Sequence, residues 1–435
     1  MAGLGFKTFV SGEVLTAADT NGYLMQGVLV FANASSRTAA ITVPTEGMFS
    51  YLKDTNSTEY YDGSAWVSGV EGDISAVTAG TGITGGGTSG AVTVSFDQAN
   101  FGGGQYAAGK NILVNGDYYW NQRAFTSTTT AGTYGFDRWS LAGATDGTTT
   151  MTAQTFGATD APLDSYEQGN YVQVQTTGQT LSTAVSTISN RTENVKTFAG
   201  QTVTVSFYAK AASGTPKIAV SLDQYFGATG SAQVNNYIGS ATLTTSWARY
   251  SLTGTLPNVD SKTFAALNTT SLNATFWLSA GSTFNARTGS LGIQTNTFSM
   301  FGVQVEAGST ATPFQTATGT KQGELAACQR YFYAHASGTT QPICIMTNYS
   351  AVLGIGYLQF PVTMRATPSV TAVSGASYYA MDIAGGTQSF SAPTLGAGST
   401  TGARIDGVLT AAVVGQAGYL RTNNAAASLA FASEL

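Results

Sequence analysis

Nucleophilic and acid–base chemistry in this chain would depend on very few residues of the right type. His335 is the only histidine, and Cys328 and Cys344 are the only cysteines. A Ser-His-Asp or Cys-His arrangement would therefore have to use His335, which lies in an aromatic segment, residues 330–335, typical of a strand. A zinc site is also a poor fit, because structural zinc takes four such ligands. We expect a structural His335 and cysteines that pack as small apolar side chains.

Glycoside hydrolysis would need two carboxylates held a few ångströms apart. Acidic residues are scattered through residues 111–318, and nothing in their spacing selects a pair. Acids in loops are mostly turn residues, and some are calcium ligands. We therefore predict no catalytic residue and no cofactor, and leave a structural calcium ion open. The acids considered are Asp117, Asp137, Asp146, Asp160, Asp164, Glu167, Glu193, Asp223 and Asp260.

Aromatic side chains on the outer faces of the predicted strands are the one feature that indicates a binding function. Sugars present apolar C–H faces that stack on aromatic rings, while their hydroxyls need polar or charged partners, and exposed aromatic residues often mark binding surfaces. Two interpretations stay open for such a surface here: a glycan platform, or a face that packs against another domain or a partner chain. Trp120 and Trp139 are expected to anchor the core instead. The candidate glycan-binding residues are Tyr208, Lys210, Asp223, Tyr225, Trp247, Arg249 and Trp277.

These candidates belong to segments whose apolar residues alternate with period two. Residues 202–210 place Val203, Val205 and Phe207 on one face and Tyr208 and Lys210 on the other, and residues 217–225 repeat the pattern. Residues 247–253 and 274–280 follow in the same way. Such strands, each with one apolar face, predict two packed antiparallel sheets over residues 111–318, a β-sandwich of the jelly-roll kind.

The rest of the chain divides into three further parts. In residues 1–68, Thr16 followed by Asp19 predicts a capped short helix, and residues 47–61 predict a hairpin. Residues 69–110 are rich in glycine and too poor in apolar groups to order alone, so they are either a linker or a segment where several chains wind together. Residues 319–435 predict a separate β tip domain. The fold class is therefore all-β.

The composition excludes several classes of protein. Charged residues make up 9% of the chain, yet no apolar run is long enough for a membrane-spanning helix. The net charge is −5 and no basic stripe is present, so neither nucleic-acid binding nor membrane insertion is expected. The first residues lack the basic and apolar regions of a secretory signal. The composition is typical of an extracellular adhesin, yet no export signal is found. We therefore expect a virion protein, which is assembled in the cytoplasm and released by lysis.

Several motifs resemble those of bacteriophage tail fibres and receptor-binding proteins. Residues 3–9 and 60–66 resemble N-terminal segments of tail proteins, and residues 72–87 resemble fibre shafts. Residues 112–117, 136–139, 205–211 and 304–314 are similar to a carbohydrate-binding-module-like jelly roll, and residues 324–331 with 360–365 resemble the tip that follows it. The resemblance implies a parallel homotrimer, a virion-attachment segment and an interchain shaft. It does not transfer a binding site.

These observations predict a phage tail fibre or spike protein that recognises a host-surface glycan and promotes adsorption. Its partners would be two further copies of the chain, other tail proteins at the N-terminal segment and the host polysaccharide. It would be located in the virion tail. One alternative is a structural adaptor or decorative fibre without receptor binding, and a second is a polysaccharide depolymerase.

Overall fold

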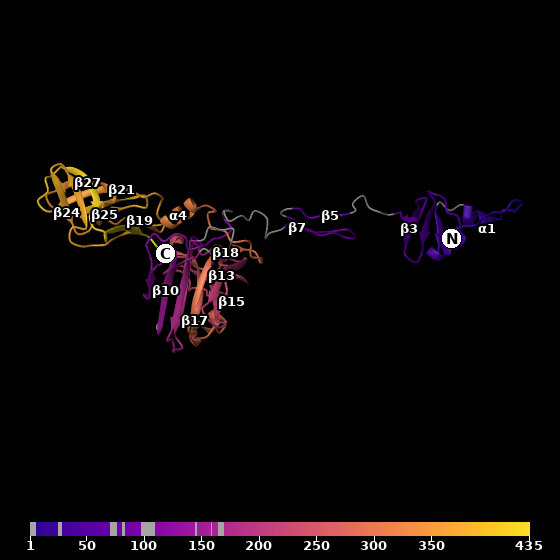
Figure 1. Ribbon diagram of the computed structural model, residues 1–435, viewed down its shortest axis with the longest axis horizontal. Helices are drawn as coiled ribbons and strands as arrows, with labels where there is room; N and C mark the ends of the chain where they lie inside the picture. The colour runs from indigo at the N-terminus through magenta and orange to yellow at the C-terminus, as the bar shows by residue number, and fades with distance from the viewer. Residues whose placement is uncertain are drawn as a thin grey trace. The chain divides into compact units, whose positions relative to one another are not determined.

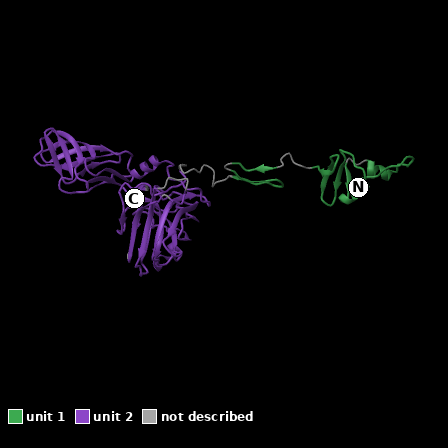
Figure 2. Ribbon diagram, viewed as in Figure 1, with its two compact units in different colours: residues 1–97 green, residues 98–435 purple. Residues whose placement is uncertain are grey.

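The computed structural model describes residues 6–24, 28–69, 76–80, 83–96, 109–143, 146–157, 159–163 and 169–435. Within this part the chain forms two compact units, Met1–Asp97 and Gln98–Leu435 (Figure 2). Strands dominate both units, so the all-β prediction is confirmed (Figure 1). None of the described helices combines the length and the apolar character needed to cross a membrane.

The first unit begins with the predicted capped turn. The Thr16 side chain accepts the Asp19 backbone N–H and the Asp19 side chain accepts that of Thr16, which starts α1 (Ala17–Asp19) before η1 (Thr20–Leu24). A sheet of order β1-β2-β3-β4 follows and contains the predicted hairpin, β2 with β3, while α2 (Ala34–Ala40) lies between β1 and β2 in the chain. The strands are β1 (Leu29–Phe31), β2 (Phe49–Leu52), β3 (Ser57–Tyr61) and β4 (Trp66–Ser68).

The glycine-rich segment contributes a second, three-stranded sheet to this unit: β5 (Val77–Thr78), β6 (Ile83–Gly87) and β7 (Val94–Phe96). Much of residues 69–110 lies outside the described residues, including 70–75, 81–82 and 97–108. Winding of several chains around this segment stays a prediction, as does the trimer.

The second unit contains the predicted β-sandwich, in which all paired strands are antiparallel. One sheet has the order β16-β13-β18-β11-β10-β8 and the other β15-β14-β17-β12-β9, and the chain crosses repeatedly between them, as in a jelly roll. The six-stranded sheet holds β8 (Ser127–Thr128), β10 (Thr148–Thr155), β11 (Asn170–Thr177), β13 (Thr202–Ala211), β16 (Ala248–Thr255) and β18 (Asn296–Ala307). The five-stranded sheet holds β9 (Trp139–Ala142), β12 (Val185–Glu193), β14 (Lys217–Tyr225), β15 (Tyr237–Thr242) and β17 (Ser271–Ala280).

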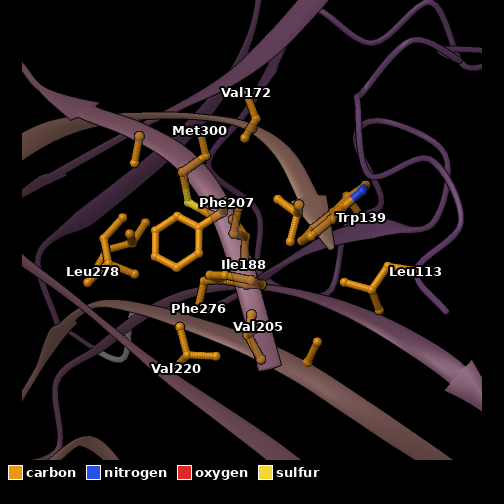
Figure 3. Close-up of a cluster of buried hydrophobic side chains, with 14 of the residues drawn as sticks. Leu113, Trp139, Val172, Ile188, Val205, Phe207, Val220, Phe276, Leu278 and Met300 are labelled. Carbon is orange, nitrogen blue, oxygen red and sulfur yellow. The ribbon is translucent and has the colours of Figure 1, made fainter. Parts of the chain in front are cut away.

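Inward-facing side chains of both sheets interleave to form the main core (Figure 3). Phe207 on β13 meets Phe276 on β17 edge to face, with ring centroids 5.4 Å apart, and Trp139 lies 5.9 Å from Phe276. The Trp139 indole N–H also donates to the Asn115 carbonyl oxygen at 2.8 Å. Trp139 is therefore the core anchor that was expected, whereas Trp120 is only half-buried.

The tip has its own hydrophobic core but belongs to the same compact unit as the sandwich. It begins with α4 (Lys321–Gln329) and builds two sheets, β19-β28-β22 and β24-β23-β27-β20-β21-β26-β25. The small sheet holds β19 (Phe332–Ser337), β22 (Ser369–Ala372) and β28 (Ser428–Ala432). The larger sheet holds β20 (Pro342–Ser350), β21 (Leu353–Gln359), β23 (Tyr379–Ile383), β24 (Gly386–Phe390), β25 (Thr394–Gly398), β26 (Gly402–Val408) and β27 (Ala417–Thr422). The boundaries proposed at residues 68, 110 and 318 stay a prediction.

Charged groups join the tip to the sandwich. The Glu193 carboxylate accepts from the Arg330 guanidinium at 2.7 and 2.9 Å and from the Tyr331 hydroxyl at 2.6 Å. Glu434 forms ion pairs with Arg123, at 2.8 Å, and with Arg138. These contacts fix the orientation of the tip against the end of the sandwich.

Candidate functional site

The outer face of the six-stranded sheet brings together four of the seven predicted candidates. Tyr208 and Lys210 alternate with the core residues of β13 and are half-buried. The strand register pairs Tyr208 with Arg249 on β16 and with Phe301 on β18. Trp247 immediately precedes β16, and its ring lies 5.1 Å from the Lys210 ammonium. The alternation therefore predicted the correct face for these residues.

Part of this face is covered. Thr204 and Ser206 share the outer side of β13 with Tyr208 but are buried, because the segment after β18 crosses over them. The Thr204 hydroxyl donates to the Gly308 carbonyl oxygen at 2.8 Å. The Arg249 guanidinium donates to Ser206 Oγ at 3.0 Å and also to the Thr312 carbonyl oxygen, which holds the segment down. The uncovered area begins at Tyr208.

Aromatic rings from distant parts of the chain form this uncovered area. We call Phe156, Tyr171, Tyr208, Trp247 and Phe301 the aromatic cluster. Phe156 lies 4.7 Å from Tyr171 and 5.6 Å from Trp247, and the rings of Tyr171 and Trp247 lie 5.4 Å apart and nearly perpendicular. Phe301 is buried beneath, 5.1 Å from Phe156 and 6.4 Å from Tyr208. The other four rings are half-buried, so they keep apolar surface available to a ligand.

Hydrogen-bond donors lie within the same cluster. Trp247 Nε1 and Arg249 Nε are buried and have no hydrogen-bond partner among the described residues. Burial raises the pKa of the Tyr208 hydroxyl, against the nearby Arg249 charge, and raises that of Tyr171, where the Asp160 charge adds to the effect. Both phenols therefore stay protonated at neutral pH and keep their O–H donors. In its described part the site therefore combines ring faces with the hydroxyl donors of Tyr171 and Tyr208.

Sequence reasoning missed three members of the cluster: Phe156, Tyr171 and Phe301. Phe301 is in β18 next to the core residue Met300, so alternation places it on the outer side, and the register shift between Ser206 and Tyr208 brings Val303 back to the core. Tyr171 is in β11 one position from the core residue Val172, which is the alternation signal that could have identified it. Phe156 follows β10 in a loop, where no periodicity applies.

The outer face of the five-stranded sheet does not present the other candidates as predicted. Trp277 is only 2% exposed, because it packs against Phe284 of η3 (Ser282–Phe284), 5.3 Å away, and its indole N–H donates to Ser221 Oγ at 3.0 Å. Asp223 is buried too and pairs with Arg287 of α3 (Asn285–Thr288) at 2.6 Å. The prediction that Trp277 and Asp223 form an open platform was therefore wrong. Tyr225, at the end of β14, is half-buried and lines a separate cavity.

The acids of the sandwich mostly have structural partners. Asp137 pairs with Arg123 at 2.9 Å, Glu193 with Arg330, and Asp146 accepts the Leu181 backbone N–H at 2.7 Å. Asp164 and Glu167 lie outside the described residues. No group of three or more His, Cys, Asp or Glu side chains in the described ranges is arranged to hold a metal ion. That the chain is not an enzyme stays a prediction.

The histidine and cysteines occupy structural positions. His335 lies in β19, where one ring nitrogen contacts the Tyr333 hydroxyl at 2.8 Å and the other the Ile343 carbonyl oxygen at 2.9 Å. Both cysteines are free thiols, and burial raises the pKa of Cys344 to about 11 and that of Cys328 well above its ordinary value. Neither thiol is activated as a nucleophile.

No protein-family model and no curated protein matches this chain. Among solved structures, the enzymatically active domain of bacteriophage CBA120 tailspike protein 4 aligns with 45% of this chain and 21% of its own length, at 13% identity and a TM-score of 0.26. The CBM22-2 xylan-binding domain of Paenibacillus barcinonensis Xyn10C aligns with 42% of this chain and all of its own, at 15% identity and a TM-score of 0.26. A putative sugar binding protein from Bacteroides thetaiotaomicron VPI-5482 aligns with 46% of this chain, at 14% identity and a TM-score of 0.26. Scores this low establish neither fold nor function, so the assignment of this chain as an all-β protein with a two-sheet sandwich follows from its own strand order.

Proposed function

We propose that the chain is a bacteriophage tail fibre or spike protein that binds a host-surface glycan at the aromatic cluster. The observation that carries the glycan proposal is the set of four half-buried rings with Lys210 and Arg249 at their edges. Pyranose rings stack their C–H faces on such surfaces and use donors at the edges for their hydroxyls. The tail location and the trimer rest on the resemblance of the sequence to phage fibres.

A single shallow face of this kind would bind weakly. Three copies in a parallel trimer would raise the overall affinity through effective concentration, without any new contact. The proposed adsorption mechanism is therefore avidity, with the virion holding the first unit and the sandwich presenting the aromatic cluster.

The test is binding of the purified full-length chain to an array of bacterial surface polysaccharides, with its mass in solution measured in parallel. Trp247→Ala should weaken the strongest array signal at least tenfold, about 1.4 kcal/mol, because it removes the ring that contacts Phe156, Tyr171 and Lys210. Tyr357→Ala removes a 70% exposed ring from the tip and is the matched control. Equal loss in both variants, or a chain that binds nothing on the array, would refute the proposal.

A purely structural role is the second candidate, and a surface of the tip favours it. On the outer side of the seven-stranded sheet, Ile345 pairs in register with Tyr419 and lies beside Tyr357, and all three are exposed. Neighbouring exposed apolar side chains on one strand face can contact another protein surface. A chain that assembles with tail proteins but ignores every polysaccharide would support this candidate.

A further inference from the structure

The outer face of the seven-stranded tip sheet carries a row of side chains that is arranged symmetrically about the middle strand. β20 is the fourth of the seven strands, with β27 and β21 on its two sides and β23 and β26 beyond them. The strand register pairs Asp382 with Tyr419, and Tyr419 with Ile345. On the other side of β20 the row continues with Tyr357, which lies beside Ile345 and pairs with Arg404.

The two halves of this row match in residue type but have opposite charges at their ends. One strand away from Ile345 there is a tyrosine on each side, and two strands away there is an aspartate on one side and an arginine on the other. Each end residue has an ion-pair partner on the same face. Asp382 pairs with Arg421 at 2.6 Å, and Arg404 pairs with Asp406 at 2.8 Å. The charges of the face are therefore balanced, with two acids and two arginines.

The middle of the row is open to solvent. Ile345 is 66% exposed, Tyr357 70% and Tyr419 37%. Contact with another apolar surface would remove these groups from water, which is favourable. The side chains of Asp382 and Arg404 are also accessible, at 39% and 32%, so both ends of the row can reach a partner.

One half of the face is recessed, and the other half projects. A hollow of about 600 Å³ lies over β21, β26 and β25, where Tyr357 borders small residues that include Ala397 and Gly402. On the other side of β20, the outward positions of β27 hold the larger side chains of Tyr419 and Arg421. The two halves of the face are therefore complementary in shape as well as in charge.

We propose that this face pairs with the same face of a second copy of the chain, about a two-fold axis that runs along β20. The axis places Ile345 against its own equivalent, Tyr419 against Tyr357 of the second copy, and Asp382 against Arg404 of the second copy. A two-fold interface needs a surface that is complementary to itself, and this row meets that condition.

The pairing would use the charges and the hollow of both copies. The two ion pairs within each chain join across the axis into an alternating series of four charges: Arg421 and Asp382 of one copy, then Arg404 and Asp406 of the other. Tyr419 and Arg421 of each copy lie over the hollow of the other copy. Every contact is made twice, because a two-fold axis relates the copies.

The contact is expected to be small and weak. Five strands span about 19 Å and seven residues of strand about 23 Å, so the face has a projected area on the order of 440 Å². Standard interfaces bury about 800 Å² per partner, so we expect pairing in the micromolar range. A glycan array is probed with the chain well below that range, so Tyr357→Ala remains a control there.

This inference goes beyond the proposed function and uses neither the aromatic cluster nor a glycan. A parallel trimer has a three-fold axis and no two-fold axis. The contact would therefore join the tips of neighbouring fibres and not the three chains of one fibre.

The test is sedimentation equilibrium of the full-length chain, at concentrations up to the high micromolar range. We expect the average mass to rise to at least twice its value at the lowest concentration. Ile345→Glu places two carboxylates together on the axis and should abolish this rise. Val43→Glu adds the same charge at an 82% exposed valine of the first unit and should leave the rise unchanged.

Charge reversal tests whether the partner is a second copy. Asp382→Arg and Arg404→Asp each set like charges against one another across the axis, so neither variant should associate alone. Mixed in equal amounts, the two variants should associate again, because one chain then has two positive ends and the other has two negative ends. A double variant that carries both changes should also associate with itself.

Three results would overturn the inference: a mass that does not depend on concentration, an unchanged rise in Ile345→Glu, or no association in the mixture of the two charge variants. A face that binds a tail protein instead of a second copy would give the first of these results. Since no glycan is present in these measurements, their failure would not affect the proposed function.

Discussion

The ion pair between Arg138 and Glu434 offers a sharp test of how the tip is held. Arg138 is 1% exposed, its guanidinium pairs with the Glu434 carboxylate and also donates to the Arg191 carbonyl oxygen, and it lies 3.5 Å from the Tyr331 ring. Breaking a buried pair by removing one partner typically costs about 3–5 kcal/mol, because the other charge is left uncompensated. For Glu434→Gln we expect about 3 kcal/mol, the low end, since Glu434 is 11% exposed and the other contacts of Arg138 remain.

The assay is urea unfolding of the full-length chain, followed by tryptophan fluorescence. All five tryptophans precede residue 319, four of them in the sandwich, and Trp139 is the neighbour of Arg138, so most of the signal reports on the sandwich side of the contact. With a slope of about 3 kcal/mol per molar urea, the midpoint should fall by about 1 M. Adding Arg138→Met to Glu434→Gln removes the uncompensated charge and should recover most of the loss.

Additive losses in the double variant would refute this reasoning, because they would mean that each side chain stabilises the fold on its own. A midpoint shift below about 0.3 M for Glu434→Gln would refute it as well, since that is the range of exposed ion pairs. Arg404→Gln disrupts a more accessible pair in the tip, with Asp406, whose side chains are 32% and 15% exposed, and it should give a smaller effect than Glu434→Gln.

Two further predictions concern single positions. Burial lowers the pKa of His335 in the folded chain, so the unfolded chain takes up a proton at a higher pH than the folded chain. The free energy of unfolding should therefore fall as the pH drops below 6.5. Because His335 is the only histidine, its titration can be followed by NMR, and His335→Gln should remove this pH dependence. Gly302 has φ +59°, so Gly302→Ala should lower the free energy of unfolding by about 1–2 kcal/mol through backbone strain. The added Cβ would lie 3.1 Å from the Tyr208 ring, so the same variant should also weaken glycan binding. Gly214→Ala, at φ +63° with open space around it, should show the strain without the loss of binding.

Much of the fold could be predicted because strand alternation is a local property. Residues 202–210 and 217–225 define β13 and β14 from their own pattern. The neighbours of these strands could not be predicted in the same way. Alternation fixes which side chains face the core but not which strand lies alongside, and β13 pairs with β18, which comes much later in the chain.

The candidate site was predictable only in part, for a related reason. Tyr208, Lys210, Trp247 and Arg249 gather as expected, since they share the outer side of β13 and β16. Alternation reports the side of a sheet and not what lies over it. The segment that contains η3 and α3 covers Trp277 and Asp223, and a covering segment of this kind has no hydrophobic periodicity from which it could be predicted.

The position of β18 has a consequence for the order in which the molecule is built. It is the last sandwich strand to leave the ribosome, yet it lies between β11 and β13. Until residues 296–307 are synthesised, those two strands lack their shared neighbour and expose unpaired edges, which invite association between nascent chains. Such long-range pairing is also slow to form. The sandwich is therefore expected to mature only after residue 307 has been synthesised, and until then a low rate of encounter or chaperones must keep nascent chains apart.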